Sequence, residues 1–204
     1  MASLDQVGQG KAILNKGEHM KTFVAKLESI SPYSKSRYHG TPELEKEHKV
    51  DYEKRTWRNR VHANDDGFVF IPPMAFKNCL SEAAKFLSIQ INGKGKATYT
   101  KHFEAGVLIT DPLVLDIKKE DVDGEWLFVP SDGKRGGGTR VERCFPLFKT
   151  WQGEITIHVI DDTITEEILV KHLEEAGKLI GIGRFRPRNN GFYGRFKVES
   201  VEQV

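Results

Sequence analysis

The chain passes directly from a strand pattern to a helix pattern within the stretch GFVFIPPMAFKNCLSEAAKFL, residues 67–87. Its apolar residues 68–71 are typical of a short strand, and Pro72 ends that strand because proline has no backbone N–H to donate. Pro73 suits the first position of a helix. Apolar side chains then recur at spacings of four, three, one and three, at Phe76, Leu80, Ala83, Ala84 and Leu87. This spacing predicts an amphipathic helix.

Strand patterns lie on both sides of this stretch. Apolar and polar side chains alternate over residues 22–28 and 155–160, with the period of two that a half-buried strand shows. A last strand is expected over residues 192–199. Shorter apolar segments predict further strands at residues 107–109, 113–117 and 126–129.

A second helix is expected after the strand at residues 155–160. Its apolar side is formed by Ile168, Leu169, Leu173 and Ala176. Thr163 and Glu166 have the spacing of a capping box, in which a hydroxyl accepts a hydrogen bond from a backbone N–H of the first helical turn. We therefore expect this helix to begin just after Thr163.

The order of these elements contains the pattern βαββαβ, which is ferredoxin-like and is shared by RNA-recognition domains. It predicts an α+β fold, in which an RRM-like antiparallel sheet carries both helices on one face and long inserted loops or hairpins. The other face is expected to be free for a partner. We expect one domain over residues 1–204, with a flexible arm at 1–19, an inserted segment at 31–66 and a glycine-rich basic loop at 131–144.

The composition is that of one soluble globular domain. The chain has 204 residues, 38% of them hydrophobic and 29% charged, with a formal net charge of +2, so any basic footprint must be local. Cys79 and Cys144 lack disulfide or metal-ligand spacing, and both are expected to be reduced thiols. The sequence shows no secretory signal and no membrane-spanning stretch, so we expect a cytoplasmic protein without a membrane partner.

Motifs for cofactor chemistry are missing from the sequence. Residues 133–138 are glycine-rich but lack the Gly-Lys-Ser/Thr ending of a phosphate-binding loop. Groupings such as His158 with Asp161 and Asp162 do not have the spacing of a helical metal site. We expect no cofactor, no metal and no catalytic residues.

Residues 181–198 interleave glycine, arginine and aromatic residues without one acidic side chain. Guanidinium groups neutralise phosphates, aromatic rings stack on bases, and glycines let a backbone approach a bulky polymer. The tract therefore indicates a nucleic-acid strand as ligand, although a turn leading into an ordinary edge strand would also explain it. Its cations, Lys197 included, are expected to be unopposed. The expected phosphate contacts are Arg184, Arg186, Arg188 and Arg195, and the expected stacking residues are Phe185, Phe192 and Tyr193.

Other basic segments extend the predicted site. The loop at 131–144 is expected either to close over the strand or to be a mobile hairpin tip without a role. The segment 31–66 lacks sustained periodicity, and its charges either contact nucleic acid or are simply solvated. Lys77 is expected on the exposed side of the first helix. The additional candidates are Lys77, Lys134, Arg135, Arg140, Arg143, Arg55, Trp57 and Arg58.

Three segments resemble the RAMP superfamily of CRISPR-associated proteins, in particular the backbone subunits that coat the guide RNA. Residues 70–80 resemble the approach to the first helix of that family, with matches at Ile71, Pro72, Lys77 and Leu80. Residues 179–183 followed by 191–196 resemble its glycine-rich loop and final strand, and residues 20–30 take the place of its first strand. The resemblance covers roughly half of the chain.

This resemblance implies an RRM-like fold, binding of single-stranded nucleic acid through the backbone, and side-by-side assembly along the strand. The segment 31–66 would correspond to a thumb-like projection. The aspartate that some members use to cut RNA has no counterpart, so cleavage is not implied. We therefore expect a non-enzymatic protein that binds single-stranded RNA or DNA and self-associates into a filament or a multi-subunit nucleoprotein complex, of a CRISPR system or of a phage or mobile element.

Two other functions stay open. The first is a protein-interaction module, such as an inhibitor that imitates a RAMP subunit within a nucleoprotein complex. The second is a metal-independent ribonuclease that uses His39 or His62 with nearby lysines, because RAMP relatives include processing ribonucleases.

Overall fold

The computed structural model describes residues 20–133 and 138–204. The predicted flexible arm at 1–19 and the candidate residues Lys134 and Arg135 lie outside the described residues.

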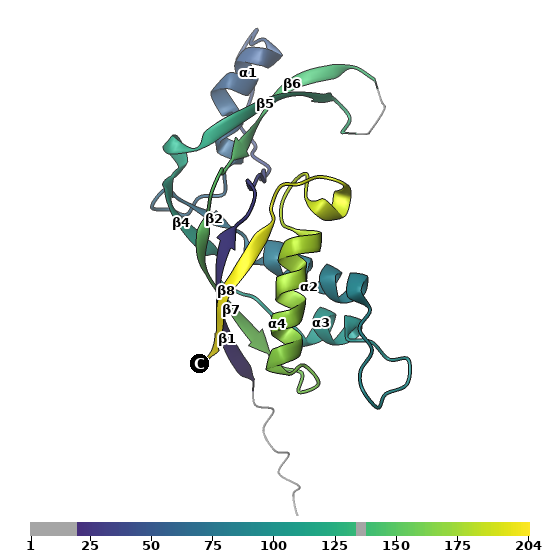
Figure 1. The fold of residues 1–204 in the computed structure, drawn as a ribbon. Helices are drawn as coiled ribbons and strands as arrows, with labels where there is room; N and C mark the ends of the chain where they lie inside the picture. Colours follow the sequence, from purple (N-terminus) through teal and green to yellow (C-terminus); the bar gives the residue numbers. More distant parts are fainter. Residues whose placement is uncertain (1–19, 134–137) are drawn as a thin grey trace, which may run out of the picture.

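A four-stranded antiparallel sheet forms the centre of the molecule. Its strands are β1 (Lys21–Ser29), β3 (Val107–Leu108), β7 (Gln152–Val159) and β8 (Phe196–Gln203), in the order β3-β7-β1-β8. Helix α2 (Pro73–Leu87) connects β1 to β3, and helix α4 (Glu166–Glu175) connects β7 to β8. Each helix thus joins two strands that are separated by one other strand, which is the split βαβ arrangement of a ferredoxin-like domain. Both helices lie on the same side of the sheet (Figure 1), and the predicted βαββαβ fold is confirmed.

Two insertions extend this domain. The first follows β1 and contains helix α1 (Lys49–Thr56), the 3-10 turn η1 (Trp57–Arg60) and strand β2 (Phe68–Ile71). The second follows β3 and contains β4 (Leu113–Lys118), the turn η2 (Lys119–Asp121) and a hairpin of β5 (Asp123–Pro130) and β6 (Arg140–Leu147). Strand β4 pairs with β2, and in Figure 1 the hairpin lies beside α1 beyond one end of the sheet.

Three shorter elements complete the chain. Helix α3 (Thr100–Gly106) precedes β3, a π-helical turn η3 (Ala176–Ile180) extends α4, and a 3-10 turn η4 (Pro187–Asn189) lies in the loop before β8. The sequence pattern indicated neither α1 nor α3, because both are short and α1 has few apolar side chains.

Three of the differences between predicted and observed element boundaries affect the regions near the candidate site. Residues 140–144 belong to strand β6 and not to a loop, because they pair with β5. The last strand spans Phe196–Gln203 and not 192–199, since the residues before it close a loop described below. Helix α4 is capped by Thr165, whose hydroxyl accepts from the Ile168 N–H at 3.4 Å, and not by Thr163, whose own N–H donates to Asp161 at 2.8 Å.

The main core lies between the sheet and its helices. The predicted stripe of α2 is confirmed for Phe76, Leu80, Ala83 and Ala84, which are buried together with the inward-facing residues of β1 and β7. The rings of Phe76, Trp151 and Phe196 are in mutual contact, with centroids 6.0–6.1 Å apart. Both cysteines are buried free thiols, and burial raises the pKa of Cys144 to about 11.

The open face of the sheet carries no phenylalanine, tyrosine or tryptophan on its strands, and the imidazole of His158 lies there within 3.1 Å of the Thr22 hydroxyl. The positions that face away from the helices are polar or small along β1 and β7, for example Thr22, Val24 and Glu154. Lys26 pairs with Glu154 at 3.6 Å, and Lys197 pairs with Glu28 at 2.9 Å, so the charges largely cancel. In the described part of the chain, this face therefore offers no phenylalanine, tyrosine or tryptophan ring for a base, and Lys26 and Lys197 on it are paired with glutamates.

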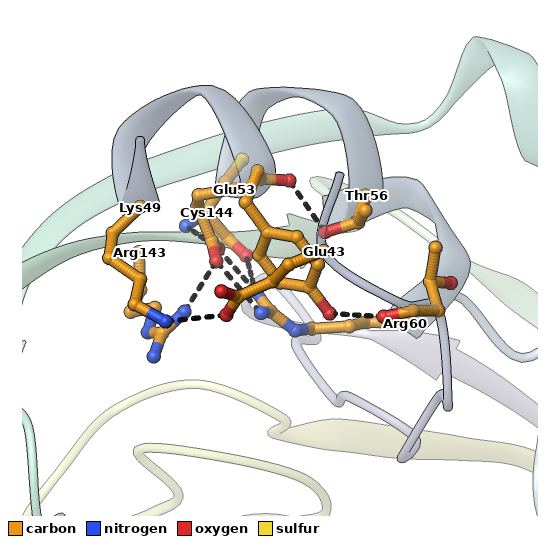
Figure 2. A network of polar contacts seen from close by, with 9 residues as sticks. Glu43, Lys49, Glu53, Thr56, Arg60, Arg143 and Cys144 are labelled. Carbon is orange, nitrogen blue, oxygen red and sulfur yellow. Dashed lines mark hydrogen bonds and ion pairs between the residues drawn. The ribbon is translucent and has the colours of Figure 1, made fainter. Parts of the chain in front are cut away.

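A buried glutamate ties the two insertions together (Figure 2). Glu53 of α1 has a relative exposure of 0%. Its carboxylate accepts hydrogen bonds from both terminal nitrogens of Arg60, from Arg143 Nη1 at 2.8 Å and from the Cys144 N–H at 2.8 Å. Burial raises the pKa of Glu53, but these bonds outweigh burial and lower it to about 2. The hairpin is therefore anchored on α1 through an ionised side chain.

Candidate nucleic-acid interface

The predicted glycine-arginine tract forms a closed loop over residues 181–194. Ile182 donates its N–H to the Gly194 carbonyl at 3.0 Å, and Tyr193 donates to Phe185 at 3.0 Å. Gly194 donates in turn to the Pro32 carbonyl at 2.7 Å, which fixes the loop to the segment that follows β1. The tract is thus a folded element with one defined shape.

The glycines of this loop serve its own closure. A Cβ atom on Gly191 would lie 1.8 Å from the Phe185 carbonyl oxygen, and one on Gly194 would lie 1.8 Å from the Ile182 carbonyl oxygen. Gly194 also has φ of 73°, which favours glycine. Close packing within the loop therefore explains glycine at these positions without an approaching polymer.

Replacing Gly194 with alanine should destabilise the protein by about 2–4 kcal/mol, because the new methyl group meets backbone that cannot easily move. Gly93→Ala is a matched control: its φ is 75°, but no heavy atom lies within 4 Å of the added Cβ. The control should be destabilised only by the backbone strain of an alanine at positive φ, which costs about 1 kcal/mol. Chemical denaturation measures both, and equal losses would contradict the account of the loop.

The expectation that the tract's cations are unopposed is wrong for three of them. Arg184 pairs with Glu125 at 3.1 Å, Arg186 pairs with Glu82 at 2.8 Å, and Lys197 pairs with Glu28 and Glu199. The acidic partners come from β5, α2, β1 and β8 itself, so a search within the tract could not find most of them. Arg195 donates from Nε to the Lys178 carbonyl at 3.1 Å. The guanidinium of Arg188 lies 5.5 Å from the Phe86 ring centroid.

The three aromatic residues of the loop form one cluster with unequal exposure. Phe185 is 45% exposed and Phe192 is 58% exposed, whereas Tyr193 between them is only 9% exposed. The Tyr193 ring is 4.6 Å from Phe192 and 6.0 Å from Phe185, measured between centroids. Phe185 and Phe192 are therefore available to a ligand, and Tyr193 is covered by them.

A groove runs along α2 beneath this loop. An open cavity of about 590 Å³ lies over the first part of the helix and adjoins a second one that shares Glu82, Lys85, Arg186 and Asn189 with it. Together their walls bring in Lys35 and His62 from the segment after β1, and Arg188 from the loop. The groove thus joins three segments that are far apart in the sequence.

The groove carries more positive than negative charge. Lys35, Lys85 and Arg188 have no carboxylate within ion-pair distance in the described part of the chain. The acidic residues in its walls are Glu104 and Glu82, and Glu82 is already paired with Arg186. A chain of phosphates would therefore meet three uncompensated cations here.

His62 sits in the wall of the groove. Burial, and then the neighbouring cations Arg37 and Lys35, lower its pKa. Its Nε2 atom is buried and has no hydrogen-bond partner among the described residues. His39, the other histidine considered from the sequence, bonds to Thr41 at 3.1 Å and lies over Tyr52.

Lys77 is not on an exposed helix face, contrary to the prediction. Its ammonium donates to the Phe103 carbonyl at 2.5 Å, to the Glu104 carbonyl at 3.0 Å and to Ser81 Oγ at 2.9 Å. Desolvation by burial lowers its pKa. Two of its hydrogen bonds hold the end of α3 and the third goes to Ser81 of α2 itself, so no ammonium proton is left for a phosphate.

The remaining candidates lie in the two insertions, outside the walls of the groove. Arg55 bonds to Glu47 at 2.7 Å, and Arg58 lies 4.2 Å from the ring centroid of Trp57. Trp57 is buried, so it presents no open ring face to a base. Arg143 is held by Glu53, as described above, and Arg140 is exposed at the start of β6.

Lys35 and Lys85 were missed as site residues in the sequence. Lys85 lies among the exposed positions of α2, and Lys35 is one charge among many in an irregular segment. Only the fold brings them opposite the loop. Within residues 20–133 and 138–204, no group of three or more histidine, cysteine or acidic side chains is placed to hold a metal ion. No helix in these ranges has the length and apolar character needed to cross a bilayer.

The fold is similar to that of a subunit in a solved type III-B complex. A chain from "Cryo-EM structure of the Type III-B Cmr-beta bound to cognate target RNA" matches with a TM-score of 0.52 and 9% identity, covering 91% of this chain and 61% of that chain. This chain thus spans about three fifths of the length of that neighbour. "Crystal structure of Cmr6 from Pyrococcus furiosus" matches with a TM-score of 0.48 and 10% identity, covering 88% of this chain and 99% of that chain.

At these identities the likeness concerns the fold alone. The first of the two structures confirms the predicted RAMP resemblance at the level of the fold. No protein-family model matches the chain, and no curated protein matches it.

Proposed function

We propose that the protein binds single-stranded RNA or DNA in the groove between α2 and the loop at 181–194, and that copies assemble side by side along the strand without catalysing a reaction. The observation that carries this proposal is the set of uncompensated cations Lys35, Lys85 and Arg188 in one groove, next to a loop that also exposes the rings of Phe185 and Phe192.

The chemistry of the groove suits a single strand better than a duplex. Single-strand binders combine a basic groove that follows the backbone with rings on which unstacked bases lie. Here the cations of the groove provide the first part, and Phe185 with Phe192, exposed on the loop that contributes Arg188 to the groove, would provide the second. The open sheet face, which RNA-recognition domains use, has paired lysines and no phenylalanine, tyrosine or tryptophan on its strands.

The fold likeness supports an RNA ligand and an assembled state. The structural neighbour belongs to a complex described as bound to cognate target RNA. By analogy with that neighbour, this chain would be one subunit of a nucleoprotein assembly. Because identity is 9%, the analogy adds support only where the groove's own chemistry agrees with it.

The side chains of the groove favour binding over catalysis. A general base must reach a substrate proton, but the free nitrogen of His62 is covered by other atoms. Lys77 is fully engaged in hydrogen bonds. A ribonuclease would need His62 to turn outward, and a His62→Ala variant would then lose cleavage.

A titration of labelled single-stranded RNA and DNA over a salt series tests the proposal. We expect the protein to bind, with a logarithm of the affinity that falls linearly with the logarithm of the salt concentration. The oligonucleotide should be intact afterwards. Cleavage without added metal would contradict the non-catalytic part and favour the ribonuclease. Absence of binding to either polymer would overturn the proposal and favour a protein-interaction module.

Glu82→Gln should raise the affinity for the oligonucleotide several-fold. The change removes a negative charge from the groove and frees Arg186 from its 2.8 Å ion pair, so that one more guanidinium can meet a phosphate. The salt slope should become steeper by about 0.7 for one added contact. Glu166→Gln on α4, outside the groove, gives the same change in net charge as a control. Equal effects of the two variants would show that only net charge matters.

A further inference from the structure

Glu125 of strand β5 holds the loop at 181–194 from the side of the hairpin. Its Oε2 accepts from Arg184 Nη2 at 3.1 Å, and its Oε1 accepts from the Tyr193 hydroxyl at 2.7 Å. Its side chain is only 23% exposed. One carboxylate from an insertion thus binds both ends of the loop that roofs the groove.

Both partners of Glu125 support the exposed rings. The Tyr193 ring contacts Phe185 and Phe192, as described above. The Arg184 guanidinium lies between two rings, 4.4 Å from the centroid of Phe185 and 3.3 Å from that of Phe145 on β6. The orientation of Phe185 and Phe192 therefore depends on two side chains that Glu125 fixes.

Phe185 is held in a backbone conformation that its side chain does not favour. Its φ is 53°, in the left-handed region where asparagine and glycine are the usual residues. The Phe185 carbonyl accepts from the Tyr193 N–H, and the close approach of Gly191 fixes it further. A strained phenylalanine that is also exposed points to a role for the ring outside the fold.

We infer that Glu125 is a positioning residue for base stacking: through Tyr193 and Arg184 it presents the rings of Phe185 and Phe192 to the bases of a bound strand. This inference rests on the proposed function, and it assigns to β5 a part in ligand binding without direct contact. It also accounts for a buried Tyr193 and a paired Arg184 in the centre of a tract that looks like a binding motif.

Stacking can be separated from phosphate binding by the choice of ligand. An abasic oligonucleotide keeps the phosphates but has no bases to stack. The wild-type protein should bind an oligothymidine, or its RNA equivalent, at least tenfold more tightly than the abasic strand of equal length. Phe185→Ala combined with Phe192→Ala should bring this ratio close to one, with the salt slope unchanged.

Glu125→Ala should lower the same ratio towards one while the abasic strand binds as before. Glu125→Gln should restore much of the ratio, because its amide oxygen still accepts from Tyr193. Added to the double phenylalanine variant, Glu125→Ala should have no further effect on the ratio. A thermal melt checks each fold, and Tyr193→Phe, which removes only the hydroxyl, replaces Glu125→Ala if that variant does not fold.

The inference is overturned if Glu125→Ala and Tyr193→Phe leave the ratio unchanged, or if they weaken both ligands equally. A wild-type protein that binds neither strand would instead overturn the proposed function. A wild-type protein that binds both strands equally would keep the binding groove and refute the stacking role.

Discussion

Replacing Lys35, Lys85 and Arg188 together with alanine should lower the affinity for a single strand about 100-fold at 0.1 M salt. Each phosphate contact to a single strand contributes about 0.7 to the slope of log affinity against log salt, so the slope should fall by about 2. These cations have no carboxylate partner among the described residues, and their removal leaves no buried charge behind. The fold should therefore melt as the wild type does.

A triple variant of Lys54, Lys101 and Lys171 is the matched control. These lysines are exposed, outside the walls of the groove, and their removal changes the net charge by the same amount. We expect less than about a threefold loss for this control, since the remaining effect is long-range and screened. If both triple variants lose affinity equally, the groove is not the binding site.

Replacing Glu53 with alanine should destabilise the protein by about 3–5 kcal/mol at pH 7, because it leaves the nearly buried guanidinium of Arg60 without its counter-charge. Glu43→Ala, which removes an exposed partner of Lys49 on the same insertion, should cost less than about 1 kcal/mol. Chemical denaturation of both variants and the wild type gives the comparison. Similar losses would contradict the account of Glu53 as the anchor of the hairpin.

The contribution of Glu53 should depend on pH in one direction. Its pKa is lowered from 4.5 to about 2 on folding, so its stabilising effect is complete above pH 4.5 and is lost as the pH falls towards 2. The difference in unfolding free energy between wild type and Glu53→Ala should therefore shrink from pH 6 to pH 3. A difference that grows on acidification would refute the ionised state of this carboxylate.

The periodic segments of this chain determine most of its central fold. The apolar stripe of α2, the alternation in β1 and β7, and the order of the elements were enough to predict βαββαβ, and the strand order confirms it. The insertions were harder to predict from the sequence, because their stability depends on contacts between distant segments. Glu53 and Arg143 are 90 residues apart, and no local pattern connects them.

The candidate site, too, was predicted only in part from the sequence. The loop at 181–194 was found from its composition, but its glycines and two of its arginines turn out to serve internal contacts. Lys35 and Lys85 have no distinctive neighbours in the sequence, and only the folded chain places them in one groove. Composition therefore located the loop, whereas the cations available to a ligand required the three-dimensional arrangement.

Photo-crosslinking tests the central claim most directly. A single-stranded oligonucleotide that carries a photoreactive base is irradiated with the wild-type protein, and the attached peptides are identified by mass spectrometry. We expect crosslinks to Phe185 and Phe192 and to the exposed residues of α2 that line the groove. Crosslinks confined to the open face of β1, β7 and β8 would show that the strand binds on the sheet, and would contradict the account.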